Sequence, residues 1–334
     1  MLLPGQKSHF VTNAMRCLGV LLLLQVPPAF AHHSSAPYYD SSRVIEVEGT
    51  ITKVFWRNPH ILFTLQDDES EEWNIETTSV SVLSRWGLTG DVVQVGSRVR
   101  LAGSAGRLSE HAMWVTNILL PSGEEVLLSA RPRWSENTLG EDLCSEVTGD
   151  TELGIFRVWT SAGRLWNRDY PLTEFARAIR AAWDPIKDEV TADCAPKGMV
   201  SIMEAPYPIE FINQGDEILL RAEEYDLVRI ISMSTEAVIE ARPASLLGHS
   251  VGRWEGDTLV VDTSGISYPH FDKTGIPQTE AAIYEERFSV SADGSQLNYV
   301  AIVTDPATFT EPTELTKTWV WRPGEELRPY NCTQ

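Results

Sequence analysis

The side chains best suited to catalysis lie in the stretch from Gly248 to Thr263, which reads GHSVGRWEGDTLVVDT. His249 and Arg253 open it, and Asp262 interrupts an otherwise apolar run near its end. A carboxylate in an apolar strand needs a partner if its face is buried, and Arg253 is the natural candidate. A histidine beside a carboxylate transfers protons near neutral pH. With His270 in the following loop, these residues form a candidate catalytic group, although structural ion pairs have the same composition.

Residues 1–31 have the features of a secretory signal peptide. Lys7 and Arg16 supply positive charge without any acidic residue, and the run from Leu18 to Val26 is apolar but too short to span a bilayer. The sequence Ala29-Phe30-Ala31 fits a small-x-small cleavage site. Met15 is an alternative start, because the residues after it suffice for a minimal signal. We therefore expect a periplasmic or secreted protein, without a later membrane-spanning stretch.

Cleavage after Ala31 would place a second candidate site at the mature N-terminus. His32 would then carry a free α-amine and be followed by His33. An N-terminal histidine chelates a metal through its amine and its ring, and His60 is the candidate for a further nitrogen ligand. Such nitrogen ligands favour Cu(II), so copper is the expected cofactor of this site. The alternative is that the paired histidines lie in an unstructured terminus and have no role.

The charge of the mature chain limits its partners. Removing residues 1–31 leaves 25 basic and 47 acidic residues, a net charge of −22. A charge of that sign and size repels phosphate backbones and anionic lipid headgroups. We therefore exclude nucleic acid as a partner and expect a small-molecule ligand; the oligomeric state stays open.

The spacing of apolar residues over 32–130 predicts an OB-like Greek-key barrel. Three strand-like runs precede a helical run, and two further strands follow, which is the element order of that fold. The expected strands are 44–56, 60–66, 72–77, 96–103 and 111–120, and the helix is 79–88. Residues 131–153 are polar and include Pro132, Gly140 and Gly149, so we expect a linker there.

Residues 154–334 predict an antiparallel, lipocalin-like β-barrel or a curved sheet with one short helix at 171–183. The strands are expected at 209–213, 217–223, 227–233, 251–254, 258–263, 282–290, 296–304 and 314–322. A barrel of this size holds one small ligand. We expect Arg229 and Glu285 to point inward, and Trp254 and Tyr268 to contact the ligand with them. The whole protein is thus expected to be mainly β.

The stretch from Gly248 to Thr263 resembles a motif in a large group of uncharacterised secreted bacterial proteins. Further segments carry the resemblance: Cys194-Ala-Pro-Lys-Gly198, Pro206-Tyr207-Pro208, Tyr284-Glu285-Glu286-Arg287-Phe288, Thr304-Asp305-Pro306 and Tyr330-Asn331-Cys332. The N-terminal half is similar to a second family of unknown function, through His32-His33-Ser34 and Trp56-Arg57-Asn58-Pro59-His60. The resemblance implies no activity, but it favours a disulfide between Cys194 and Cys332, since both lie in matching segments.

Three hypotheses about function follow. The first, which we favour, is an exported protein that binds a small apolar or amphipathic ligand in the C-terminal barrel. The second is a cofactor-independent acid–base enzyme of the isomerase, hydratase or lyase type, which would use His249, Arg253 and Asp262. The third is a periplasmic copper-binding protein built on His32, His33 and His60. Hydrolase, zinc-protease and nucleotide-binding motifs are missing from the sequence.

Overall fold

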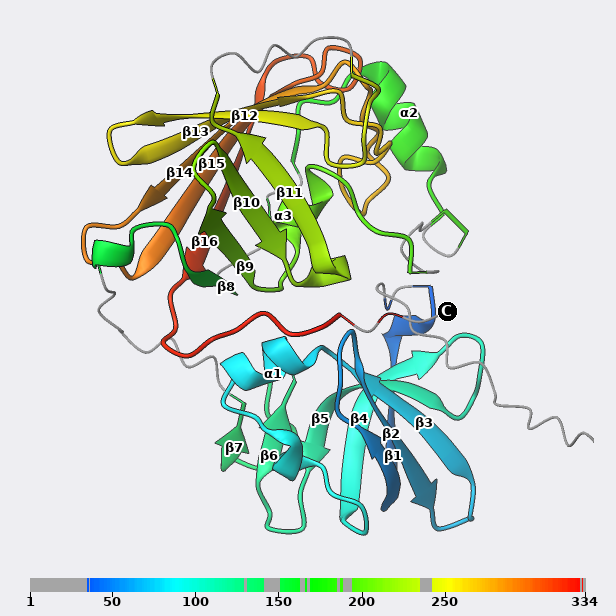
Figure 1. Ribbon diagram of the computed structural model, residues 1–334. Coiled ribbons are helices and arrows are strands. Elements are labelled where there is room, and N and C mark those ends of the chain that lie inside the picture. Colours follow the sequence, from blue (N-terminus) through cyan, green and yellow to red (C-terminus); the bar gives the residue numbers. More distant parts are fainter. Residues whose placement is uncertain are drawn as a thin grey trace, which may run out of the picture.

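The computed structural model describes residues 35, 37–128, 131–140, 151–162, 166, 169–184, 187–188, 194–234, 242–330 and 332. They form two β-rich parts, drawn one above the other in Figure 1. The expectation of a mainly β fold is therefore confirmed. The expected signal peptide, including its cleavage site, lies outside the described residues.

The N-terminal part is a seven-stranded mixed sheet in which five strands form a ring. The strand order is β3-β2-β1-β4-β5-β6-β7, and β3 pairs with β5 to close the ring. The strands are β1 (Tyr39–Phe55), β2 (Ile61–Asp67), β3 (Glu72–Thr77), β4 (Arg98–Gly106), β5 (Ala112–Leu119), β6 (Glu125–Leu127) and β7 (Thr138–Leu139). The helix α1 (Val80–Arg85) and the 3-10 helix η1 (Gly90–Val92) connect β3 to β4. This connectivity matches the expected OB-like arrangement.

The long strand β1 makes the ring possible because it serves two neighbours. Its first part pairs with β4 and its last part pairs with β2, with the change at Gly49 and Thr50. A Cβ on Gly49 would lie 2.3 Å from the carbonyl oxygen of Gln66, so only glycine fits this crossing. At the other end of the sheet, β7 lies within the expected linker and pairs with β6.

The C-terminal part is a closed barrel of nine strands in the order β10-β11-β12-β13-β14-β15-β16-β8-β9. The strands are β8 (Val158–Ala162), β9 (Ile209–Asn213), β10 (Glu217–Ala222), β11 (Leu227–Ser232), β12 (His249–Glu255), β13 (Thr258–Ser264), β14 (Ile283–Val290), β15 (Gln296–Thr304) and β16 (Thr313–Val320). The described helices of this part are α2 (Glu174–Ala182), α3 (Ser201–Glu204), and the 3-10 helices η2 (Thr151–Leu153) and η4 (Glu224–Asp226).

The barrel differs in two respects from the eight antiparallel strands expected. β8 pairs with both β16 and β9 and so closes the ring. β11 and β12 run parallel, and they pair only at Ile231–Ser250 and Ser232–Val251. The physical reason is the connection between them, because residues 233–248 are too many for a tight turn and allow the chain to return in the same direction.

Large side chains fill the interior of the barrel. Trp159, Trp319, Tyr284, Tyr299, Phe211 and Phe288 are each less than 2 % exposed. Helix α3 packs into the same core through Ile202 and Met203. Lys317 lies on the inner face of β16, and its Nζ donates to the carbonyl oxygens of Met203 (2.9 Å) and Ala205 (2.5 Å). Burial lowers the pKa of Lys317 to about 7.

Glu223, a buried carboxylate, is one of several groups that join the two parts. Tyr207 also donates its hydroxyl to the Pro59 carbonyl oxygen (3.3 Å), and Arg85 Nη1 donates to the Ser161 carbonyl oxygen. Glu223 is 1 % exposed. Its Oε1 accepts hydrogen bonds from Asn58 Nδ2 (3.0 Å) and Ser81 Oγ (2.5 Å), both in the N-terminal part. Its Oε2 accepts from the backbone N–H of Arg328 (2.9 Å). Burial raises the pKa of Glu223, and the three donors oppose that rise.

The C-terminal segment from Arg322 to Tyr330 runs between the two parts, shown in red in Figure 1. Arg322 Nη1 donates to the carbonyl oxygen of Arg85 at the end of α1 (2.8 Å). The backbone N–H of Tyr330 bonds to the carboxylate of Asp226 (3.2 Å). This segment therefore contacts α1 at one end and η4 at the other.

A disulfide between Cys194 and Cys332 fixes the end of this segment, with the two Cα atoms 5.9 Å apart. The pairing expected from the resemblance is present. Disulfides persist in oxidising compartments such as the periplasm and the extracellular space. The bond is thus a feature typical of a protein outside the cytoplasm.

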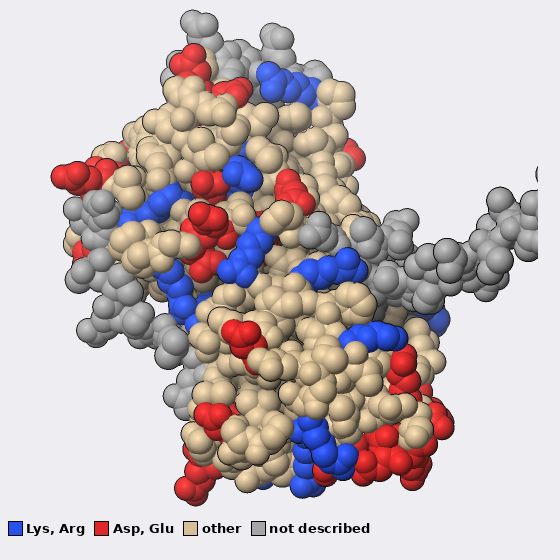
Figure 2. Space-filling view, turned by 60° about the horizontal axis from the view of Figure 1, so that its bottom comes forward, with Lys and Arg blue, Asp and Glu red and all other residues tan. Residues whose placement is uncertain are grey.

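The surface carries charges of both signs. On the face drawn in Figure 2, basic side chains lie among acidic ones and form no continuous basic area. No helix in the described part of the chain is long and apolar enough to cross a membrane. The exclusion of nucleic acid stays a prediction.

Candidate functional site

A pocket of about 490 Å³ opens in the barrel wall between β11 and the chain leading into β12. It exists because β11 and β12 pair over two residues only, so the strands separate beyond Ile231. The lining comes from residues 227–232 on one side and 242–251 on the other, together with Glu217 from β10. Aromatic side chains occupy the described interior of the barrel, and this pocket lies in its wall.

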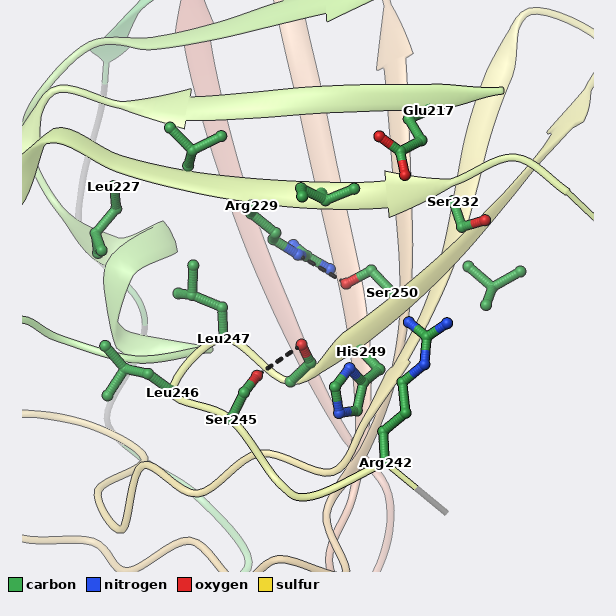
Figure 3. Close-up of a pocket in the computed structure, with 14 residues that line it drawn as sticks. Glu217, Leu227, Arg229, Ser232, Arg242, Ser245, Leu246, Leu247, His249 and Ser250 are labelled. Carbon is green, nitrogen blue, oxygen red and sulfur yellow. Dashed lines mark hydrogen bonds between the residues drawn. The ribbon is translucent and has the colours of Figure 1, made fainter. Parts of the chain in front are cut away.

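The pocket is polar at one end and apolar at the other (Figure 3). Three leucines, Leu227, Leu246 and Leu247, form the apolar end. The polar end carries Glu217, Ser232, Arg242 and His249. Arg229 and Ser250 lie between the two ends. An arrangement of this kind suits a ligand with an apolar body and a polar end.

Arg229, which lines the pocket, forms a buried ion pair with Glu286. Alternation along β11 turns Arg229 inward, while its neighbours Val228 and Ile230 are 46 % and 53 % exposed. Arg229 Nη1 donates to Glu286 Oε1 at 3.0 Å, and Nη2 donates to Oε2. Burial would lower the pKa of Arg229, but the adjacent Glu286 carboxylate raises it. Arg229 therefore keeps its charge in the barrel wall.

Hydroxyl groups complete the bonding of this ion pair. Ser250 Oγ accepts from Arg229 Nε (2.9 Å), and Thr263 Oγ1 accepts from Arg229 Nη2 (2.6 Å). Tyr299 donates its hydroxyl to Glu286 Oε1 (3.0 Å). Burial, together with the Glu286 charge, raises the pKa of Tyr299 well above its usual value. The cluster is rigid because five strands, β11 to β15, supply its members.

Of the predicted catalytic residues, His249 lines the pocket, and its Nε2 lies 2.9 Å from the carbonyl oxygen of Pro243. Arg253 and Asp262 form the expected ion pair, with Nη1 and Oδ2 2.5 Å apart. However, their side chains are 45 % and 46 % exposed, so the pair lies on the outer face of the barrel. The ion pair is therefore exposed to solvent, and its two residues are not among those that line the pocket.

His270 has a different set of neighbours. Its ring packs edge-on against Trp183 and Tyr268, at centroid distances of 5.1 and 5.5 Å. Tyr268 itself is 6 % exposed and lies against Gly198, where a Cβ would come within 2.2 Å of the tyrosine Cβ. Both residues thus belong to packed loop structure, and neither is among the residues that line the pocket.

The predicted ligand-binding residues do not all lie at the pocket. Arg229 lines the pocket. Trp254 is 44 % exposed and packs edge-on against Phe156. Glu285 lies on the outer face, with Oε1 3.6 Å from Arg287 Nη1 and a side chain that is 49 % exposed. Its neighbour Glu286 takes the inward position.

Sequence reasoning missed Glu286, although a signal for it was present. Tyr284 and Phe288 have the same parity as Glu286 along β14, and all three are fully buried. Large aromatic residues at alternate positions indicate the inner face of a strand. That pattern would have selected Glu286 over Glu285 as the partner of Arg229.

Two of the three residues in the metal hypothesis, His32 and His33, lie outside the described residues. His60 is described and is 8 % exposed. Its Nδ1 lies 2.5 Å from Glu76 Oε1, and Tyr39 donates to the other oxygen of Glu76 (2.6 Å). Within the described ranges, no group of three or more metal-ligating side chains comes together. Copper binding at the mature N-terminus stays a prediction.

Comparison with known proteins gives a family match for the N-terminal part. Residues 21–117 match a family of unknown function, DUF6152. The match runs from the expected signal peptide into β5, so the N-terminal part resembles that family and the barrel lies outside the match. No curated protein matches the chain.

Proposed function

We propose that the protein binds a small amphipathic ligand in the wall pocket between β11 and β12. The main support is the polarity of the pocket, with three leucines at one end and charged side chains at the other. Its volume of about 490 Å³ falls within the range of roughly 300–1,000 Å³ that is usual for small-molecule sites. The ligand's apolar body would lie on the leucines, and its polar end would meet Arg242 and His249.

Arg229 supplies a further polar contact for the ligand. A guanidinium has five N–H donors, and four of those of Arg229 have acceptors on Ser250, Thr263 and Glu286. One hydrogen on Nη1 is left without an acceptor among the described residues. A buried donor without a partner is costly, so a ligand oxygen at this position would be favoured.

A substitution at the apolar end tests the proposal. In Leu247→Arg, a charge would occupy the leucine end, and we expect binding of dodecanoate to weaken at least tenfold. Isothermal titration calorimetry on the full mature protein measures this. Ile283→Arg is the matched control, because Ile283 is an exposed apolar residue (54 %) outside the pocket lining. Binding that is equal in both variants, or no saturable binding at all, would contradict the proposal.

We also propose that the protein is exported. The disulfide between Cys194 and Cys332 supports this, as does the predicted signal peptide. Mass spectrometry of the protein from the periplasmic fraction or the medium tests it, with a mature N-terminus at His32 as the expected result. A chain that keeps residues 1–31 and stays in the cytoplasm would contradict export.

The acid–base alternative has less support. Of its proposed residues, His249 lies at the pocket, whereas Arg253 and Asp262 pair on the exposed outer face. A general base needs a reacting group within hydrogen-bond reach and a partner that orients it. The contact of His249 with the Pro243 carbonyl favours a different role, in which the histidine holds the loop at the mouth of the pocket.

A further inference from the structure

On the edge of β11 that faces the pocket, no strand among the described residues pairs at Val228. In the antiparallel ladder with β10, Met233 lies opposite Asp216, and its N–H donates to the Asp216 carbonyl oxygen at 2.8 Å. Successive residues of a strand point their backbone groups to opposite sides, so every second residue points to the same side. Ile231 and Arg229 therefore bond towards β10, as Met233 does. Val228 and Ile230 direct their backbone groups away from β10, towards the pocket.

The strand on that side does not reach Val228. Pairing with β12 begins at Ile231, three residues further along the chain. Across the pocket, Ser245 is bonded on its far side, since its N–H donates to the Gly265 carbonyl oxygen and its own carbonyl oxygen accepts from Ser267. The pocket therefore lies where the barrel wall is interrupted, between β11 and the turn that begins at Ser245.

From this geometry we propose that the pocket binds a short apolar peptide in an extended conformation, as an added strand along Val228–Ile230. The inference rests on the proposed function and names the class of ligand. Strand addition supplies main-chain hydrogen bonds for affinity, and alternate side chains supply selectivity. The peptide would complete the sheet between β11 and the segment at Ser245. A length of about three residues matches the open part of β11.

The side chains around the pocket match such a ligand. Leu246 and Leu247 accept an apolar peptide side chain at one end. At the other end, Glu217 and Arg242 come from opposite walls (Figure 3). Neither side chain forms an ion pair with any described residue, so the Glu217 carboxylate and the Arg242 guanidinium are both available to a charged ligand. A peptide terminus carries charge next to polar amide groups and would meet this end of the pocket.

Two tripeptides separate strand addition from simple apolar binding. The first probe is Leu-Val-Leu, and the second is the same peptide methylated at both amide nitrogens. Methylation removes the main-chain donors but leaves the apolar side chains, so we expect affinity to fall at least tenfold in titration calorimetry. Equal or tighter binding of the methylated peptide would overturn the inference, because hydrophobic contact alone would then explain the affinity.

A proline substitution tests the same strand from the protein side. Val228→Pro removes the N–H that points away from β10, and it leaves the ladder with β10 intact. The preceding residue, Leu227, already has φ −71° and ψ 141°, which proline tolerates in its neighbour. We expect Leu-Val-Leu to bind Val228→Pro at least tenfold more weakly than Val228→Ala, which keeps the N–H. Thermal melts of both variants verify that each is folded, and equal affinities in two folded variants would overturn the inference.

Dodecanoate distinguishes failure of this inference from failure of the proposed function. If dodecanoate binds in a Leu247-dependent manner and Leu-Val-Leu does not bind, the amphipathic site stands and the peptide inference is wrong. If neither probe binds, both are wrong. Binding of Leu-Val-Leu that is lost on methylation and in Val228→Pro supports the inference.

Discussion

In the buried ion pair between Arg229 and Glu286, each charge is stabilised by the other. Both side chains are almost fully shielded from water, at 3 % and 0 % exposed. Desolvation offsets most of the attraction in such a pair, so the intact pair adds little net stability. Loss of one partner is different, because the other charge stays buried without compensation.

Glu286→Gln should therefore lower the free energy of unfolding by about 3–5 kcal/mol. The amide has the size of the carboxylate but leaves the Arg229 charge unbalanced. Urea denaturation followed by circular dichroism measures the change. Glu285→Gln is the control on the same strand; its side chain is 49 % exposed, so its effect should be about 0.5 kcal/mol or less. Similar losses in both variants would contradict the assignment of Glu286 to the inner face.

Lys317 gives a pH dependence whose sign follows from its environment. Burial lowers its pKa to about 7 from the usual 10.5, although Glu204 and Glu224 oppose this. Between pH 7 and about 10 the unfolded chain binds the proton and the folded chain does not, so stability rises with pH. Relative to Lys317→Met, the wild type should gain about 1 kcal/mol per pH unit over this window. A stability difference that is constant from pH 7 to 10 would show that Lys317 keeps its proton in the folded protein.

At the scale of strands, alternation predicted most of the barrel, and it failed where both faces of a strand are buried. Leu259, Val260 and Val261 on β13 are all 0 % exposed, so the apolar pattern did not reveal the inner face. Val260 lies opposite Arg253 and Arg287 on the outer face. Long arginine stems cover apolar surface in such positions. Because both faces of β13 are apolar, the pattern leaves open whether Asp262 points inward; its side chain lies on the outer face.

The pocket could not be predicted from local sequence because it arises from a missing pairing. The sequence predicts strands at 227–233 and 251–254, but a parallel pairing over only two residues depends on how the long connection crosses the barrel. Two of the lining residues, Arg229 and His249, are predicted as site residues because their side chains are ionisable. Leu246 and Leu247 are not, because two leucines in a loop have no period that indicates a site.

For the molecule as a whole, Glu223 is the contact whose loss should separate the two parts. In Glu223→Ala, Asn58 and Ser81 would lose their acceptor in a buried site, at a cost of about 2–3 kcal/mol. We expect calorimetry to show one unfolding transition for the wild type and two for the variant. Glu314→Ala is the control, since Glu314 is exposed on β16. A single transition in Glu223→Ala, unchanged in position, would mean that other contacts couple the two parts.

The C-terminal segment also affects how freely the two parts can move. Residues 322–330 contact α1 and η4, and the backbone N–H of Arg328 donates the third hydrogen bond to Glu223. Removal of this segment would take away these contacts, while the bonds of Glu223 with Asn58 and Ser81 would stay. The two parts would remain joined but should reorient more freely relative to each other.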